Sequence, residues 1–460
     1  MNTRTNDLGR DPVHPLLLRL ALPSILAQLV NMLYNIVDRI YIGHIPGVGA
    51  AALTGVGVTM PVILLITAFS SLIGMGGAPR AAIKMGQQDN DGAERVLGTC
   101  FTTLLGISVV LTVFFLAFGR PLLMAFGASE STIDYAVAYM NIYVCGTIFV
   151  QMALGLNTFI STQGLTRISM MTVVIGAIIN IVLDPVFIFL FGMGVEGAAL
   201  ATILSQAVSA VWVLKFLSSS KSSLRLRKKY LRPDPKILGA VLALGVSPFI
   251  MQSTESLLNL VFNTSLQWYG GDLAVGSMTI LASMMQFMML PLMGLTQGTQ
   301  PIISYNYGAQ NNGRVRQAFS LLLRYAIGYT VFFWVLILAV PQLFVSMFTS
   351  DPQLVEYASW AMRIYLGASC IMGAQIACQQ TFIAVGQAKS SLFLALLRKV
   401  ILLIPLILIL PFFFENKVMA VFLAEPVADL MATTVTVIMF TIQFRKILAK
   451  NEPHSKEEPV

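Results

Sequence analysis

The chain has 460 residues, of which 56% are hydrophobic and only 11% charged, with 29 Lys and Arg against 21 Asp and Glu. A soluble globular protein carries about 25% charged residues, so this composition excludes a soluble enzyme. The mean hydropathy of +0.78 also excludes a disordered chain, a collagen and a coiled coil. A helix needs about 20 apolar residues to cross a bilayer, so the hydrophobic content suffices for about twelve such helices.

Long apolar runs follow one another along the chain, separated by short polar segments. Strands of a membrane barrel are about ten residues long and alternate in polarity, so runs of more than 20 apolar residues exclude a barrel. The first fifteen residues are polar and carry no cleavable signal pattern, so we expect the first span to be retained. The prediction is an all-α integral membrane protein with twelve transmembrane helices. The predicted spans are 16–43, 50–74, 96–118, 133–157, 168–191, 195–217, 238–263, 273–298, 318–341, 355–380, 390–413 and 418–443.

Most basic residues fall on one side of the predicted membrane, and only Arg120 and Lys417 lie in loops on the other. Cytoplasmic loops are enriched in Lys and Arg, so this asymmetry predicts a multi-pass protein of the cytoplasmic (inner) membrane with both termini in the cytoplasm. The basic excess therefore reports orientation in the lipid bilayer and predicts no nucleic-acid partner. The 22 residues assigned to the cytoplasmic side are Arg4, Arg10, Arg19, Arg80, Lys84, Arg95, Arg167, Lys215, Lys221, Arg225, Arg227, Lys228, Lys229, Arg232, Lys236, Arg314, Arg316, Lys389, Arg445, Lys446, Lys450 and Lys456.

The two halves of the chain resemble each other at a shift of 222 to 225 residues. Six spans per repeat is an even number, so both halves enter the membrane from the same side, and a pseudo-two-fold axis along the membrane normal relates them. Two six-helix lobes of this kind are typical of transporters that alternate access to a cleft between the lobes. The matches include Pro23 with Pro248, Asp38 with Asn263, Pro79 with Pro301, Gly86 with Gly308, Tyr143 with Tyr365, Gly164 with Gly386, and Thr202 with Glu425.

This repeat divides the chain into four parts. We expect an N-terminal lobe at 1–217, a basic cytoplasmic linker at 218–236, a C-terminal lobe at 237–445 and a polar cytoplasmic tail at 446–460. The linker contains the basic run 221–235, which favours a solvated tether. Contact with anionic lipid headgroups is the alternative for this run.

A polar stripe runs along the first predicted span. Gln28, Asn31, Asn35 and Asp38 are spaced by three, four and three residues, which places them on one helix face. A carboxylate near the bilayer centre costs about 2.5–3.5 kcal/mol, so this face is expected to point into the bundle. A hydrogen-bonded seam between helices is the purely structural alternative, but amides alone would serve that purpose without a charge.

The fifth and sixth spans carry a second polar group. Asn180 and Asp184 lie on one face at i and i+4, and Pro185 loosens the helix beside them. Thr202 lies in the sixth span among small residues that let helices approach closely. A carboxylate, an amide and a freed carbonyl suit a cation or a proton. Together with Asp38, these residues predict an oxygen-rich ion-coupling cluster in the N-terminal lobe.

Charged residues also lie within the C-terminal spans. Glu255 is in the seventh span, and Glu425 and Asp429 are at i and i+4 in the twelfth. Arg398 and its neighbour Lys399 lie in the eleventh, where they either pair with a cavity acid or extend to the cytoplasmic headgroups. The five intramembrane acids of the two lobes would cost roughly 12–17 kcal/mol if uncompensated. They are therefore paired, protonated or exposed to a water-filled cavity.

The eighth span is rich in methionine, including Met284 and Met288. Flexible, polarisable methionines suit ligands of varied shape, so these two are candidates for a pliable wall around the substrate. Packing against other helices or lipid is the alternative. The four cysteines lie within apolar runs, and the three histidines are scattered, so no metal site and no enzyme activity are expected.

Five stretches carry a family resemblance: LYNIVDRIYIGH, GGAPRAAIKMGQQD, NIVLDP, GVEGAALAT and QGTQPIISYNYGAQ. The chain resembles the multidrug and toxic compound extrusion (MATE) family over roughly 16–443. The resemblance implies a twelve-helix antiporter that exports small cationic lipophilic compounds in exchange for H⁺ or Na⁺ and needs no other cofactor. It also implies that Asp38, Asn180 and Asp184 bind the coupling ion and that Glu255 contributes in the C-terminal lobe.

One feature of the family pattern is different here. Some Na⁺-coupled members carry an acid within the tenth span, whereas the interior of that span here has Arg363, Gln375 and Gln379. The resemblance therefore gives no support for a Na⁺ site in the C-terminal lobe, and any Na⁺ is expected at Asp38, Asn180 and Asp184. We expect the protein to function as a monomer.

Other functions fit the same twelve spans. A lipid-linked precursor flippase of the same superfamily, or a major-facilitator carrier with six plus six helices, is the main alternative. Translocation of a labelled lipid without an ion gradient would favour the flippase. An intramembrane enzyme would need a nucleophile–base or metal constellation, and the sequence contains no recognisable one.

Overall fold

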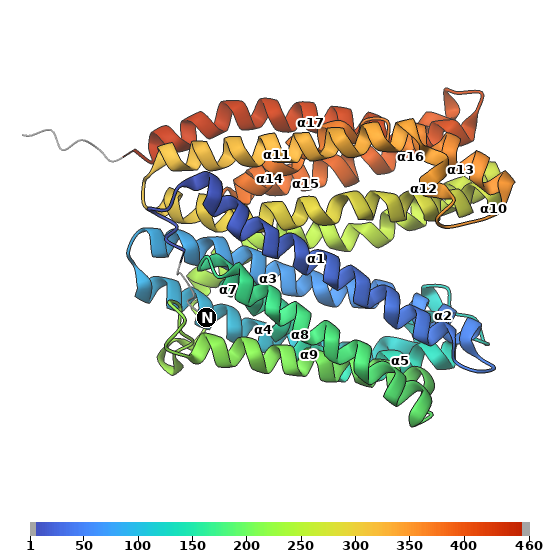
Figure 1. Ribbon diagram of the computed structural model, residues 1–460, viewed down its shortest axis with the longest axis horizontal. Helices are drawn as coiled ribbons and strands as arrows, with labels where there is room; N and C mark the ends of the chain where they lie inside the picture. The colour runs from blue at the N-terminus through green and yellow to red at the C-terminus, as the bar shows by residue number, and fades with distance from the viewer. Residues whose placement is uncertain (1–5, 453–460) are drawn as a thin grey trace, which may run out of the picture.

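The computed structural model describes residues 6–452, and all regular structure in that range is helical (Figure 1). Residues 453–460 of the predicted tail lie outside the described range. The helices are α1 Val13–Gly43, α2 Gly49–Val58, α3 Met60–Gly86, α4 Asn90–Ala125, α5 Ile133–Cys145, α6 Thr147–Val150, η1 Gln151–Gly155, α7 Leu156–Thr162, α8 Thr166–Pro185, η2 Val186–Leu190, α9 Gly194–Ser218, η3 Lys228–Tyr230, α10 Pro235–Gly308, α11 Asn312–Ala339, α12 Pro341–Val345, α13 Pro352–Tyr365, η4 Ser369–Ile371, α14 Met372–Ala384, α15 Ala388–Leu396, η5 Leu397–Leu403, α16 Ile404–Ile409, η6 Leu410–Phe412 and α17 Lys417–Lys450.

The predicted number of spans is confirmed. Within residues 6–452, nine helices are long and apolar enough to cross a membrane, and two further spans are helix pairs bent by 58° and 49°. One of the nine, α10, is in fact two spans, because Gly271 has a φ of 65° and a ψ of −160° and breaks the helix there. Only glycine adopts this conformation readily. The total is therefore twelve spans.

Several predicted spans were too short, because the helices continue past the apolar runs. The predicted span 50–74 is a short α2 and a longer α3, which meet at Thr59 and reach Gly86. The predicted span 273–298 likewise continues to Gly308. The extra turns carry polar and small residues, because helix ends that leave the bilayer no longer need apolar side chains.

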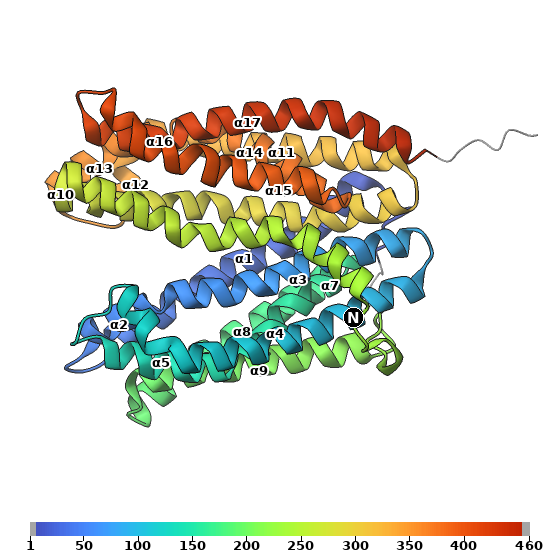
Figure 2. The ribbon, with the colours of Figure 1, turned by 180° about the vertical axis from the view of Figure 1, so that it is seen from behind.

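The helices form two lobes that lie side by side (Figures 1 and 2). Helices α1 to α9 make the N-terminal lobe and α10 to α17 make the C-terminal lobe. Both described chain ends lie at the same end of the molecule, which also carries most of the Lys and Arg; we call it the basic end. The first turns of α1 and α10 pack into the core of the opposite lobe. Leu16 and Leu20 join a C-lobe cluster, and Val241 joins an N-lobe cluster.

Backbone geometry at the basic end reproduces the internal repeat. Gln88 and Gln310, 222 residues apart, have φ angles of 62° and 57°, and Gly164 and Gly386 have φ angles of 78° and 77°. The residues that follow the two glutamines, Asp89 and Asn311, cap α4 and α11 by accepting a backbone hydrogen bond. The same turn is therefore built twice, once in each lobe.

The two lobes meet at the basic end through glycines. A Cβ atom on Gly86 of α3 would lie 2.0 Å from the carbonyl oxygen of Tyr305 in α10. A Cβ atom on Gly308 of α10 would lie 2.0 Å from the carbonyl oxygen of Ile83 in α3. These two glycines are matched by the repeat, so the two-fold axis passes between them. We call this pair of contacts the glycine crossing.

The segment between the lobes, predicted as a solvated tether, is docked on the N-terminal lobe. Gln163 Oε1 accepts hydrogen bonds from Ser222 Oγ, at 3.0 Å, and from the Ser223 amide, at 2.8 Å. The buried carboxylate of Glu94 in α4 pairs with Arg227 Nε at 2.8 Å. The basic side chains of the segment remain exposed, so the structure adds an anchor at Glu94 and Gln163 to a run whose charges are solvated.

Candidate functional site

The polar stripe of α1 lies partly between the two lobes and partly inside the N-terminal lobe. Midway along α1, Gln28 Nε2 donates to Gln297 Oε1 of α10 at 3.0 Å, which links the two lobes. Asn31 is partly exposed and Asn35 is exposed, further toward the opposite end. Asp38 is buried. The stripe therefore begins as a contact between lobes and ends inside the N-terminal lobe, where α1 packs against α8.

The predicted residues of α8 and α9 lie together. Asn180 Nδ2 donates to Asp184 Oδ1 and to Thr202 Oγ1, each at 3.3 Å. The Thr202 hydroxyl donates in turn to the carbonyl of Ala198 at 3.0 Å. All three polar residues are buried. The α-helical bonding of α8 ends at Pro185 and gives way to the π-helix η2, so the loosening expected at this proline is present.

Asp38 of α1 completes this group, because its carboxyl group lies close to that of Asp184. Among the described residues, the buried oxygens without a hydrogen-bond partner include Asp38 Oδ1, Asn180 Oδ1 and Asp184 Oδ2. A buried acceptor without a donor is costly, and a bound cation or proton removes that cost. Four oxygen-bearing residues from three helices therefore form one cluster; we call Asp38, Asn180, Asp184 and Thr202 the N-lobe cluster.

The chemistry of the N-lobe cluster suits a hard monovalent cation or a proton. Carboxylate, amide and hydroxyl oxygens are ligands for such cations, and two facing carboxylates can share one proton. No group of three His, Cys, Asp or Glu residues suited to a metal ion occurs in the part of the chain that the structure describes. A Na⁺ here would accordingly need Asn180 and Thr202 as well as the two acids.

Two tyrosines, the partly buried Tyr34 and the buried Tyr139, adjoin the cluster and were not identified from the sequence. Tyr34 lies near Asp38 and Asp184, and Tyr139 lies beside Asp38 and Thr202. Tyr34 is four residues before Asp38, so the helical period of the α1 stripe could have included it. Tyr139 is in α5, and nothing in its own segment connects it to α1 or α9.

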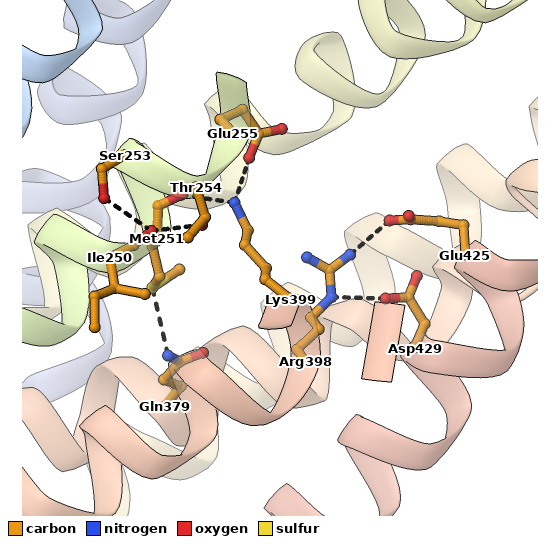
Figure 3. A network of polar contacts seen from close by, with 10 residues as sticks. All are labelled: Ile250, Met251, Ser253, Thr254, Glu255, Gln379, Arg398, Lys399, Glu425 and Asp429. Atoms are coloured by element: carbon orange, nitrogen blue, oxygen red, sulfur yellow. Dashed lines mark hydrogen bonds and ion pairs between the residues drawn. The ribbon is translucent and has the colours of Figure 1, made fainter. Parts of the chain in front are cut away.

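The C-terminal lobe contains an ionic network in which every member except Glu255 is largely buried (Figure 3). Arg398 Nε donates to Asp429 Oδ1 at 2.7 Å, and Arg398 Nη2 donates to Glu425 Oε1 at 2.8 Å. Its neighbour Lys399 donates to the carbonyl of Met251 at 2.6 Å and forms an ion pair with Glu255. Both basic residues point at acids within the lobe, so the alternative in which they extend to the headgroups was wrong.

The local helix geometry explains how two adjacent basic residues serve different helices. Arg398 and Lys399 lie in the π-helix η5, which connects α15 to α16. Adjacent residues on a helix point in different directions around its axis. Arg398 therefore reaches α17, while Lys399 reaches α10 (Figure 3). Short π-helical segments are rare and frequently occur at functional sites.

The predicted methionine wall is contradicted by the structure. Met284 and Met288 are 3% and 0% exposed and belong to the core of the C-terminal lobe, with Phe262 and Phe422. They are four residues apart and share the face of α10 that packs on other helices of the same lobe. Their role in this structure is packing, and they do not line a surface that faces the other lobe.

Comparison with known proteins agrees with this architecture. The MatE family model matches the chain twice, over residues 23–186 and 248–409, which is the internal repeat at a shift of 223 to 225. Multidrug export protein MepA of Staphylococcus haemolyticus (strain JCSC1435) is 25% identical over 419 residues, which cover 90% of this chain and 91% of that protein.

Solved structures share the fold. A crystal structure of MATE in the bent conformation has a TM-score of 0.91 at 22% identity and covers 98% of this chain and 100% of its own. An outward-facing conformation of a multidrug resistance MATE family transporter of the MOP superfamily has a TM-score of 0.90 at 22% identity, covering 97% and 99%. The two family matches span more than half of the chain, which therefore belongs to the MATE family of multi-pass membrane transporters and is not an enzyme.

Proposed function

We propose that this protein is a multidrug efflux antiporter that exports small cationic amphipathic compounds in exchange for H⁺ or Na⁺. The observation that carries the proposal is the N-lobe cluster, in which three buried oxygens lack a protein donor among the described residues. The export of drugs is the named role of the MepA relative. We further propose that the protein works as a monomer in the cytoplasmic membrane and needs no cofactor besides the coupling ion.

The conformation fits one step of such a cycle. The glycine crossing brings the lobes together at the basic end, whereas Asn35 and Glu255, further toward the opposite end, are exposed. The lobes also diverge toward that opposite end in both views (Figures 1 and 2). With the basic end in the cytoplasm, as the distribution of Lys and Arg favours, this is an outward-facing state. Arrival of the ion at Asp38 and Asp184 would then accompany release of cargo to the outside.

The balance of charge supports a cationic cargo. The N-lobe cluster holds two carboxylates, and the C-lobe network holds three carboxylates against two basic side chains. Net negative charge within the membrane-spanning lobes attracts cations and repels anions. Binding of the coupling ion neutralises part of this charge, which weakens the attraction for the cargo. Ion and cargo would therefore compete through charge without needing identical ligands.

The test is ion-driven transport by the purified protein in proteoliposomes. We expect Asp38→Asn and Asp184→Asn each to reduce gradient-driven transport of ethidium to the background of empty vesicles, because neither amide can carry the exchangeable charge. Asp134→Asn is the matched control, since Asp134 is exposed and, within residues 6–452, pairs only with the exposed Arg120. Wild-type rates in the Asp184→Asn variant would refute the proposed role of the cluster.

A further inference from the structure

The pairing of Lys399 with Glu255 differs from the other ion pairs of the C-terminal lobe. Lys399 reaches from η5 across to α10, where its ammonium contacts the Glu255 carboxylate and the carbonyl of Met251 (Figure 3). The Lys399 side chain is 9% exposed, whereas that of Glu255 is 54% exposed. The pair therefore has a buried cation and an accessible carboxylate, and a second cation can approach Glu255 from the open side.

Glu255 lies on the face of α10 that is turned toward the other lobe. Gln252, three residues earlier on the same helix face, donates through Nε2 to Ser71 Oγ of α3 at 2.8 Å, and α3 belongs to the N-terminal lobe. The chain of α10 runs from the basic end toward the opposite end through this region. Glu255 is consequently one turn beyond this contact between lobes, at the start of the surface that stays exposed between them.

Arg398 provides the contrast within the same π-helix. Its guanidinium bonds to two carboxylates, Glu425 and Asp429, whose side chains are only 5% and 2% exposed. A planar guanidinium held by two buried acids is fixed in place. The ammonium of Lys399 is a compact charge on a flexible chain, it contacts a single carboxylate, and that carboxylate is half exposed. Of the two neighbouring basic residues, Lys399 is the one that can be displaced.

We propose that Lys399 is a built-in competitor for cationic cargo at Glu255 and thereby sets the affinity for monovalent amphipathic organic cations. This inference rests on the proposed function and adds a residue that determines specificity. A cargo cation can approach Glu255 only against the charge of Lys399, so binding requires the ammonium to move off the carboxylate while it keeps the Met251 carbonyl. The Glu255 carboxylate does not attract compounds without a positive charge, so Lys399 does not change the affinity for them.

The competition has a consequence for transport. A bare carboxylate beside a cavity would hold a lipophilic cation strongly and release it slowly. A tethered ammonium that returns to Glu255 replaces the departing cargo, so the carboxylate is not left unpaired when cargo leaves. Lys399 would therefore weaken binding and assist release at the same time.

The experiment measures binding of ethidium, a lipophilic monovalent cation, to the purified full-length protein in nanodiscs. We expect Lys399→Met to bind ethidium about five- to tenfold more tightly than the wild type, because the competing charge is gone. Lys399→Arg keeps a cation beside Glu255 and should stay close to the wild-type affinity. Affinity for the uncharged dye Nile red should be the same in all three proteins, which a general change in packing would not produce.

The double variant separates competition from packing. Glu255→Gln should weaken ethidium binding, and Glu255→Gln combined with Lys399→Met should bind no more tightly than Glu255→Gln alone, because Lys399 acts only through Glu255. Thermal unfolding establishes that each variant is folded. If Lys399→Met does not fold, Lys399→Gln replaces it, since its amide can still donate to the Met251 carbonyl.

The outcomes distinguish this inference from the proposed function. A folded Lys399→Met or Lys399→Gln variant with wild-type or weaker ethidium affinity overturns the competitor role, even while the wild type transports ethidium. Tighter binding that persists in the double variant overturns it as well. A wild-type protein that neither binds nor transports ethidium refutes the proposed cationic cargo instead.

Discussion

The side chains with the lowest tolerance for change are the charged groups buried in the C-terminal lobe. Glu425 and Asp429 are nearly inaccessible to solvent, and both depend on the single guanidinium of Arg398. Removing one member of a buried ion pair leaves an uncompensated charge and costs about 3–5 kcal/mol. Replacing all members by neutral groups costs much less, because no charge then remains to be desolvated. Arg398 is therefore expected to be a structural residue that holds η5 against α17.

This expectation gives a stability prediction at the level of single residues. Arg398→Met should lower the free energy of unfolding by about 3–5 kcal/mol, because it leaves Glu425 and Asp429 buried without a cation. The triple variant Arg398→Met, Glu425→Gln, Asp429→Asn should recover most of the loss. Thermal unfolding of the purified proteins in one detergent measures both. Equal stability of the single variant and the wild type would contradict the structural role of Arg398.

The residues of the N-lobe cluster could be predicted because each has a local signal. Asp38 belongs to a polar helix face, and Asn180 and Asp184 are spaced by one helical turn ahead of a proline. The partners of Arg398 and Lys399 could not be predicted, because they depend on the direction that a π-helix gives to two adjacent side chains. The burial of Met284 and Met288 could not be predicted either. A methionine-rich sequence does not show which face of the helix packs against its own lobe.

Among the helices, α3 and α10 control how closely the two lobes approach. At the glycine crossing, backbone meets backbone, so even one methyl group at Gly86 or Gly308 would overlap a carbonyl oxygen of the other helix. The contact repeats along the same helices, because a Cβ atom on Gly76 of α3 would lie 2.3 Å from the Val241 carbonyl oxygen of α10. A carbonyl oxygen in a helix cannot move aside as a flexible side chain can. Closure of the basic end therefore requires glycine at these positions.

The prediction for these helices concerns the equilibrium between conformations. Gly308→Ala should shift the protein toward states that are open at the basic end, because the added methyl group prevents α10 from seating on α3. Spin labels at the exposed Asn90 of α4 and Gln317 of α11, in a variant without the four native cysteines, report the separation of the lobes. The distance distribution should move to longer distances relative to the same labels without the glycine substitution.

The control for this prediction is Gly328→Ala in α11. A Cβ atom there would meet nothing within 4 Å, so the substitution changes helix propensity without a steric effect on the lobes. An unchanged distance distribution in Gly308→Ala would contradict the assigned role of the glycine crossing.

Sequence patterns predicted the helices better than their ends and connections. Twelve apolar runs gave twelve spans because a bilayer sets the length of each apolar stretch. The continuation of α3 to Gly86 and the docking of the linker on Glu94 lie outside the bilayer pattern. Those features depend on contacts between distant segments, which hydropathy does not record.

At the scale of the whole molecule, antiport requires that ion and cargo influence one another through the same conformational cycle. Such coupling is reciprocal, so an ion gradient that drives cargo implies a cargo gradient that drives ions. One inward charge at about 100 mV supplies roughly 2.3 kcal/mol, enough to sustain about a fifty-fold cargo gradient. The N-lobe cluster is the only group to which the proposal assigns the coupling ion, so both directions of coupling should fail together when it is neutralised.

The most direct test of the central claim is ion movement driven by cargo. Proteoliposomes that hold the purified protein receive an ethidium gradient in the absence of any imposed ion gradient, and counterflow of H⁺ or of Na⁺ is recorded in separate assays. We expect the wild type to move one of these ions opposite to ethidium, and the Asp38→Asn, Asp184→Asn double variant to move neither. Ethidium transport by the wild type without any H⁺ or Na⁺ counterflow would contradict the antiport account and favour an uncoupled carrier or flippase.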